Sequence, residues 1–254
     1  MLLAVDVGNT QTHIGAFGGA ELANRWRIAT DPKTTADQLG AAVTTLLGTR
    51  EMSFGDIEGS IVSTVVPVLG PQWAAFSERY LGERCLDVGP GLRTGMPIRV
   101  DSPHELGADR LVNAVAAHER FGGPCLSVDF GTSTNFDAVS SAGEYLGGAI
   151  GPGLEVSIDA LGSRTARLPR IEIDSPPAAI GRNTVAAMQS GFVYGFAGLV
   201  DGIARRIAAE LEGAPTIVAT GGLAGAIAPL CETIDEVDEM LTLTGLRLIW
   251  ERNQ

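Results

Sequence analysis

Apolar positions along the chain recur with two periods, one typical of strands and one typical of helices. Short apolar runs bounded by turn residues predict strands at Gly59–Val65, Cys85–Val88 and Pro215–Ala219. Apolar residues three and four positions apart predict helices at Thr35–Leu47, Pro71–Leu81, Ala108–Phe121, Thr184 to about Leu211, Leu223–Leu230 and Leu241–Arg252. The mixture predicts an α/β fold. The stretch from about Gly151 to Pro177 shows neither period and is expected to be irregular.

One strand-and-turn pattern occurs twice, about half a chain apart. Leu3–Thr12 reads LAVDVGNTQT and Leu126–Asn135 reads LSVDFGTSTN, so that Asp129 follows Asp6 by 123 positions. Each copy continues into a second apolar run, which predicts a β-hairpin with a turn rich in Gly, Asn and Thr. The repeat predicts two similar lobes.

The boundary between these lobes is expected at Gly122-Gly123-Pro124, which follows the predicted helix Ala108–Phe121. The N-terminal lobe would then span residues 1–122 and hold the first hairpin. The C-terminal lobe would span residues 123–254 and hold the second.

Composition and charge narrow the classes of function. The 254 residues are 45% hydrophobic and carry a net charge of −12, which disfavours binding to nucleic acid or to an anionic membrane. A local cradle of backbone N–H groups can still hold a phosphate in an acidic protein. The widely spaced Cys85, Cys125 and Cys231 predict reduced thiols in a cytoplasmic protein. Neither a signal peptide nor a membrane span is predicted.

The first hairpin carries residues suited to a phosphate. Gly8 lets the backbone approach a ligand closely, and Asn9, Thr10 and Thr12 add side-chain donors. The Asp6 carboxylate, at the end of a buried strand, is an oxygen ligand for Mg²⁺. One such turn alone is more often an ordinary Asn-containing turn. The second copy favours a pair of phosphate-binding hairpins.

A third glycine site follows the last predicted strand, where Ile217–Thr220 runs into Gly221-Gly222 and then a helix. Glycines there let a ligand lie near a helix N-terminus, although such junctions are common. Two phosphate hairpins followed by this turn resemble the actin–hexokinase–acetate kinase ATPase superfamily. The sequence GxxxxGK[ST] is absent, which disfavours a P-loop NTPase.

Gly107-Ala108-Asp109-Arg110 opens a predicted helix between the two hairpins. The Asp109 carboxylate can accept the proton of an attacking hydroxyl. The Arg110 guanidinium and the helix N-terminus can hold an anion. From spacing alone, an ordinary helix cap beside a solvated arginine is the leading alternative.

Together these motifs resemble the type III pantothenate kinase family over essentially the whole chain. The matching segments are Asp6–Thr10, Gly107–Arg110, Val128–Thr132, Gly147–Gly153, Asn183-Thr184, Thr220–Gly222 and Leu241–Arg247. The resemblance implies the duplicated actin-like (ribonuclease H-like) ATPase fold, with a mixed sheet flanked by helices in each of two similar lobes. It also implies ATP-dependent phosphorylation of pantothenate to 4'-phosphopantothenate, the first step of coenzyme A biosynthesis.

The resemblance further implies roles for individual residues. ATP phosphates would contact Thr132 and the segment Asp6, Val7, Gly8, Asn9, Thr10, Gln11, Thr12 and His13, with Mg²⁺ near Asp6. Pantothenate would contact Gly107, Ala108, Asp109 and Arg110, with Asp109 as proton acceptor. Asp129 would bind a monovalent cation, K⁺ or ammonium. Thr184 would reach pantothenate across the interface of a homodimer.

The second hairpin departs from the family's usual Asp-Phe-Gly-Thr-Ala-Thr-Thr at Ser133 and Asn135, and Asn135 changes the shape of a hydrogen-bonding side chain. His13 is interpreted first as a surface residue of its hairpin and second as a ligand contact.

Two alternatives stay open beside the pantothenate kinase interpretation. Another small-metabolite kinase of the superfamily would share the hairpins but should lack Gly-Ala-Asp-Arg. A non-catalytic accessory or regulatory protein on this fold would not need Asp6, Asp109 and Asp129, and all three are present.

Overall fold

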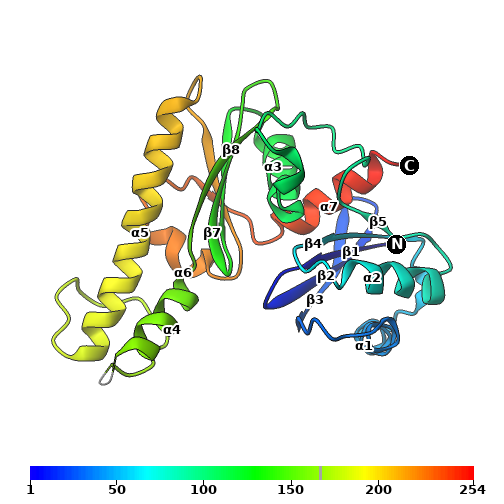
Figure 1. Cartoon of the computed structure of the whole chain (residues 1–254), viewed down its shortest axis with the longest axis horizontal. Helices are drawn as coiled ribbons and strands as arrows, with labels where there is room; N and C mark the ends of the chain where they lie inside the picture. Colours follow the sequence, from blue (N-terminus) through cyan, green and yellow to red (C-terminus); the bar gives the residue numbers. More distant parts are fainter. Residues whose placement is uncertain (166–167) are drawn as a thin grey trace. The chain divides into compact units, whose positions relative to one another are not determined.

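A computed structural model describes residues 1–165 and 168–254, and the chain divides into two compact units (Figure 1). Unit 1 comprises Met1–Gly95, Ser102–Ala116 and Leu241–Gln254. Unit 2 comprises Met96–Asp101 and Ala117–Met240. This division differs from the lobes expected from the sequence, residues 1–122 and 123–254, because the chain returns to unit 1 for its last helix, α7 (Leu241–Glu251).

Unit 1 is built on a mixed five-stranded sheet with the order β3-β2-β1-β4-β5. β1 is antiparallel to β2 and parallel to β4; β2 and β3 are antiparallel, and β4 and β5 are parallel. The strands are β1 (Leu2–Val7), β2 (Gln11–Gly18), β3 (Glu21–Ala29), β4 (Gly59–Thr64) and β5 (Leu86–Asp87). The predicted strands near 59–65 and 85–88 are confirmed, and β3 is an addition to them.

Two helices cover one face of this sheet, α1 (Ala36–Gly48) and α2 (Gly70–Phe76) (Figure 1). α1 begins at Thr35, which forms a capping box with Gln38. α2 continues into one π-helical stretch, Ser77–Leu81, so the predicted helix Pro71–Leu81 is confirmed in two parts. Alternate strand residues such as Leu3 and Val5 form the core against these helices.

α7 packs on β1, β2 and β4, where its Leu243 lies against Gly15. α3 (Ala108–Phe121) lies beside α7. A Cβ on Gly245 would stand 2.3 Å from the carbonyl oxygen of Val112, so glycine permits this close helix contact. The helices predicted at 108–121 and at the C-terminal end are confirmed.

Unit 2 repeats the sheet topology of unit 1. Its strands are β6 (Cys125–Phe130), β7 (Ser133–Val139), β8 (Tyr145–Pro152), β9 (Thr216–Thr220) and β10 (Glu236–Val237). Taken from β8, the order is β8-β7-β6-β9-β10, with the same sequence of antiparallel and parallel pairs as in unit 1. Two mixed five-stranded sheets flanked by helices confirm the predicted α/β duplication.

Three helices build the core of unit 2 against this sheet: α4 (Leu154–Arg164), α5 (Thr184–Glu210) and α6 (Ala224–Ile227). α5 and α6 confirm predicted helices; a 3₁₀ turn at Ala228–Leu230 follows α6. α4 corrects the expectation that 151–177 is wholly irregular. Its only buried residues are Leu154 and Ile158, one turn apart, so its sequence carries too few apolar positions to show a period.

Short 3₁₀ turns at Phe54–Asp56 and Pro103–Glu105 complete the elements described. Across 1–165 and 168–254, no helix combines the length and the hydropathy that a membrane span requires.

Candidate active site

Asp6 belongs to a row of polar residues that crosses the sheet of unit 1. In the strand register Asp6 stands opposite His13 on β2 and Ser63 on β4, and His13 stands opposite Arg27 on β3. Residues in register on neighbouring strands point to the same face. The row therefore shares one face of the sheet, opposite the face that buries Val5.

The Asp6 carboxylate is desolvated and held by one serine. The Ser63 hydroxyl donates to Asp6 Oδ1 at 2.5 Å. Burial raises the pKa of Asp6 to about 7; the Ser63 hydrogen bond opposes this rise, and the negative charge of Asp109 adds to it. The structure therefore brings the two predicted carboxylates, Asp6 and Asp109, within electrostatic reach of each other in unit 1.

Asp109 lies in the first turn of α3. Its Oδ1 accepts the backbone N–H of Arg110 at 2.9 Å. Burial raises the pKa of Asp109, and the hydrogen bond and positive charge of Arg110 oppose that rise. A Cβ on Gly107 would come within 2.6 Å of Asp109 Oδ1, so the motif needs glycine for the carboxylate to sit here. A half-buried carboxylate with a raised pKa is suited to accept a proton near neutral pH.

The hairpin tip between β1 and β2 is closed by its own backbone. The Gly8 N–H donates to the Gln11 carbonyl at 3.0 Å, and Asn9 and Thr10 are exposed at the tip. Val7 packs its side chain into the core, so it can offer only backbone groups to a ligand.

Thr12 and His13 take different places at the start of β2. The Thr12 hydroxyl is buried and lies 2.9 Å from that of Thr30, with which it shares a hydrogen bond. His13 is half-buried and faces the Asp6 row. Burial lowers the pKa of His13, and the charges of Arg27 and Arg25 lower it further, which favours a neutral imidazole.

In unit 2, Asp129 stands in the same place on β6 as Asp6 on β1. It faces Asn135 on β7 and Thr220 on β9. The second hairpin is one residue shorter, so that Asn135 takes the place of His13. Ser133 donates to the Asn135 side-chain oxygen at 2.9 Å, which ties together the two residues that depart from the family pattern.

Thr132 lies in the turn of this hairpin. Its carbonyl oxygen would be 2.1 Å from a Cβ on Gly153, so the glycine lets two chain segments meet there.

The Thr220-Gly221 turn wraps the carboxylate of Asp129. Gly221 has φ +93°, and a Cβ there would stand 2.4 Å from Asp129 Oδ1. The Thr220 hydroxyl is buried and has no hydrogen-bond partner among the residues described. An orphaned hydroxyl beside a carboxylate fits the oxygen ligands that a hard cation takes.

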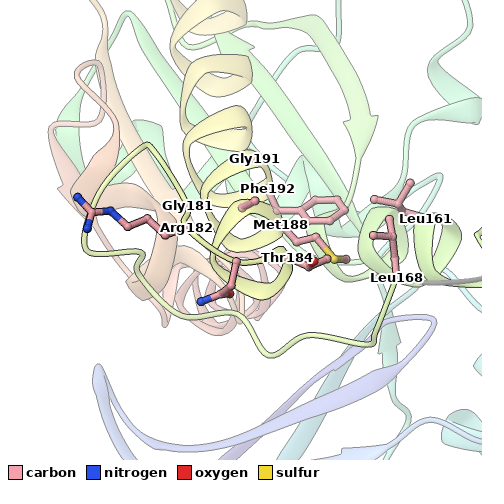
Figure 2. A pocket seen from close by; sticks show the side chains of 10 residues that line it. Leu161, Leu168, Gly181, Arg182, Thr184, Met188, Gly191 and Phe192 are labelled. Carbon is pink, nitrogen blue, oxygen red and sulfur yellow. The ribbon is translucent and has the colours of Figure 1, made fainter.

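Thr184, the first residue of α5, lines a pocket of about 720 Å³ within unit 2 (Figure 2). Phe192 and Met188 of α5 face Leu161 and Leu168, whereas the Arg182 side chain extends away from this apolar side. The volume is that of a small-molecule site. Asn183, also at the pocket, caps α5 by accepting the Ala186 N–H at 2.9 Å.

Ser63 is the site residue that sequence reasoning missed. The available signal is that β4, a strand that is otherwise buried and apolar, carries the hydroxyl residues Ser60, Ser63 and Thr64. Which of them meets a carboxylate depends on the parallel pairing of β4 with β1, and local sequence does not reveal that pairing.

Known proteins are similar to this chain in sequence and in fold. A family model described as type III pantothenate kinase matches residues 2–206. A protein of that name from Moorella thermoacetica is 51% identical over 253 residues, and one from Anaeromyxobacter sp. strain Fw109-5 is 53% identical over 254 residues; each match covers 100% of both chains.

Among solved structures, the chain is similar to the ROK hexokinase from Thermus thermophilus. The TM-score is 0.51 at 14% identity, and the match covers 100% of this chain and 99% of the other. This likeness concerns the fold.

Proposed function

Because the chain belongs to the type III pantothenate kinase family, we propose how its own residues divide the work of that reaction. The protein phosphorylates pantothenate with ATP, the first step of coenzyme A biosynthesis. One observation carries the division of roles: two half-buried carboxylates, Asp6 and Asp109, lie within electrostatic reach of each other, and both have a raised pKa.

Asp109 is the proton acceptor. As the primary hydroxyl of pantothenate attacks the γ-phosphorus of ATP, a P–O bond forms, the β–γ bridging bond breaks, and the hydroxyl proton passes to Asp109. Gly107, Ala108 and Arg110 line the pantothenate site. The Arg110 guanidinium, in the first turn of α3, suits the carboxylate of pantothenate.

The segment from Asp6 to His13 contacts the ATP phosphates, as does Thr132. Gly8, Asn9, Thr10 and Gln11 offer backbone and exposed side-chain groups, whereas Val7 and Thr12 offer backbone alone because their side chains are engaged within unit 1.

Asp6 would hold the Mg²⁺ that accompanies ATP, and its oxygen donor fits that ion. Across the described ranges no three His, Cys, Asp or Glu side chains form a metal-binding group, but a nucleotide-bound Mg²⁺ needs only one or two carboxylates. When bound, the ion supplies neutralisation of phosphate charge.

Asp129 would hold a monovalent cation, K⁺ or ammonium, together with the unpartnered hydroxyl of Thr220. The protein acts as a cytoplasmic homodimer, and Thr184 reaches the pantothenate bound to the other subunit. Apolar side chains exposed in unit 2, among them Ile150 and Val185, support such an interface.

The test is a kinase assay with ATP and pantothenate in K⁺, repeated with Na⁺ in its place. We expect phosphopantothenate in K⁺ and a clear loss of rate in Na⁺. Equal rates in the two salts would remove the cation role of Asp129. Thermal stabilisation by ATP and by pantothenate, measured separately, distinguishes an enzyme from a non-catalytic relative, which should respond to neither.

A further inference from the structure

We propose that Ser63 is a positioning residue for phosphoryl transfer: its hydroxyl holds Asp6 Oδ1, so that Oδ2 is left to face the Mg²⁺ of ATP. The proposal rests on the metal-holding role proposed for Asp6. It adds a residue from a strand that contributes no other group to the site.

The backbone fixes Ser63 beside Asp6. β4 pairs with β1 in parallel, and Ser63 is in register with Asp6, so the two side chains leave the sheet side by side on one face. Ser63 is fully buried at 0% exposure, and its neighbours Ile61 and Val62 are buried as well. The donor therefore has one fixed place from which to reach the carboxylate.

The carboxylate needs such a donor. Rotation about the last torsion of an aspartate is broad, so packing alone fixes the plane of the carboxylate poorly. The distance from Ser63 Oγ to Asp6 Oδ1 is 2.5 Å, which is typical of a hydroxyl donating to a charged oxygen. Within the part of the chain that the structure describes, Ser63 is the one hydrogen-bond partner of the Asp6 side chain. Because a serine has one proton to donate, this bond also commits the hydroxyl to Asp6 rather than to phosphate.

The same strand offers a matched control. Ser60 also lies on β4, is 2% exposed, and shares a hydrogen bond of 2.7 Å with Ser77. It is in register with Leu3, three positions from Ser63, and so points to the opposite face of the sheet. Replacing either serine removes one buried hydroxyl from β4, but only Ser63 touches the proposed site.

The experiment measures ATP binding by calorimetry at increasing Mg²⁺, for the unaltered protein, Ser63→Ala and Ser60→Ala. We expect Ser63→Ala to raise the Mg²⁺ concentration for half-maximal binding about tenfold or more, since a hydrogen bond to a charged group is lost. Binding of pantothenate alone should stay unchanged. Ser60→Ala should lower stability and leave the Mg²⁺ dependence unchanged.

Two further variants guard against a folding defect. Ser63→Thr keeps the donor and should restore the Mg²⁺ dependence, whereas Ser63→Cys keeps the size with a weak donor and should not. An unchanged Mg²⁺ dependence in Ser63→Ala or Ser63→Cys overturns the proposal, as does an equal loss in Ser60→Ala. If the unaltered protein binds ATP without regard to Mg²⁺, the metal role of Asp6 fails instead, so the two failures are distinguishable.

Discussion

Asp6 and Asp109 are both half-buried carboxylates with a raised pKa, yet their surroundings differ. Asp6 lies within a sheet, where its one partner is the neutral hydroxyl of Ser63. Asp109 lies at the start of a helix, where a backbone N–H and the Arg110 guanidinium favour its charged form. Environments that push the pKa values of two titratable groups apart commonly give the groups different roles in catalysis. Here they favour Asp109 as the base and Asp6 as the holder of the metal.

We predict that Asp109→Asn lowers kcat by about 10²- to 10⁴-fold, because an amide cannot accept the hydroxyl proton. Thermal stabilisation by ATP should persist, since the fold and the phosphate segment are intact. Asp37→Asn is the matched control: Asp37 also lies in the first turn of a helix, α1, but it is exposed. Full turnover by Asp109→Asn would exclude its role as base.

The raised pKa of Asp6 predicts that the free energy of unfolding depends on pH when the protein is free of ATP and divalent metal. The pKa of this carboxyl is about 7 in the folded chain and 3.8 for an ordinary aspartate, the value taken for the unfolded chain. Between these pH values the folded chain therefore binds more protons than the unfolded chain. The protonated Asp6 carboxyl therefore contributes its full stabilisation of the fold below about pH 4, and this contribution is lost as the pH rises through 7.

Asp6→Asn removes this titration. We expect it to raise the free energy of unfolding by on the order of 2–4 kcal/mol at pH 8, with a gain that shrinks toward pH 4. Denaturant unfolding at several pH values measures it. A gain that is the same at pH 4 and pH 8 would contradict the assignment.

At the scale of elements, local signals decided what the sequence could predict. α1 has a capping box and α3 ends before Gly122, so both helices were predictable. β8 was not predicted because it carries three glycines, which local patterns associate with turns. A Cβ on Gly148 would stand 1.6 Å from the Phe136 carbonyl oxygen, so this glycine marks close packing of strands rather than a turn.

β3 was missed for a different reason. It is an edge strand in which every second residue is exposed and Arg25 and Arg27 take exposed positions, so its apolar run is interrupted. The site was only partly predictable from the sequence. Asp6 and Asp109 were recognisable from their motifs, but their approach depends on tertiary packing, and so does the contact of Ser63 with Asp6.

The turn between β9 and α6 provides a test at this scale. Gly221→Ala should lower stability by about 2 kcal/mol or more and abolish the K⁺ response, because φ is +93° and the new methyl would meet Asp129 Oδ1. Gly222→Ala is the control, since nothing lies within 4 Å of a Cβ there. Unfolding curves and assays in K⁺ and Na⁺ measure both. A normal K⁺ response in Gly221→Ala would contradict the proposed binding of the cation at Asp129.

Across the whole molecule, one topology occurs twice and its equivalent positions have taken different side chains. Each sheet places a hydroxyl residue on the parallel neighbour of its aspartate: Ser63 beside Asp6 and Thr220 beside Asp129. The first hydroxyl is committed to its carboxylate, and the second has no hydrogen-bond partner among the residues described. The duplication thus accounts for the like positions of the two aspartates. The different state of the neighbouring hydroxyl accompanies the different ions proposed for them, Mg²⁺ at Asp6 and a monovalent cation at Asp129.

The proposed homodimer makes a prediction that concerns two chains at once. If Asp109 of one subunit and Thr184 of the other serve the same pantothenate, Asp109→Asn and Thr184→Val should each be weakly active alone. Co-expressed with different tags, they should form mixed dimers in which one site combines an unaltered Asp109 with an unaltered Thr184. Random pairing makes half of the dimers mixed, and each mixed dimer has one intact site of two. About a quarter of the normal activity should therefore return in the unfractionated mixture, and about half in the purified mixed dimer. Activity in the purified mixed dimer is the measurement, and a mixture of two Asp109→Asn chains is the control. If Thr184 served its own subunit, every site would carry one of the two defects, and no activity would return.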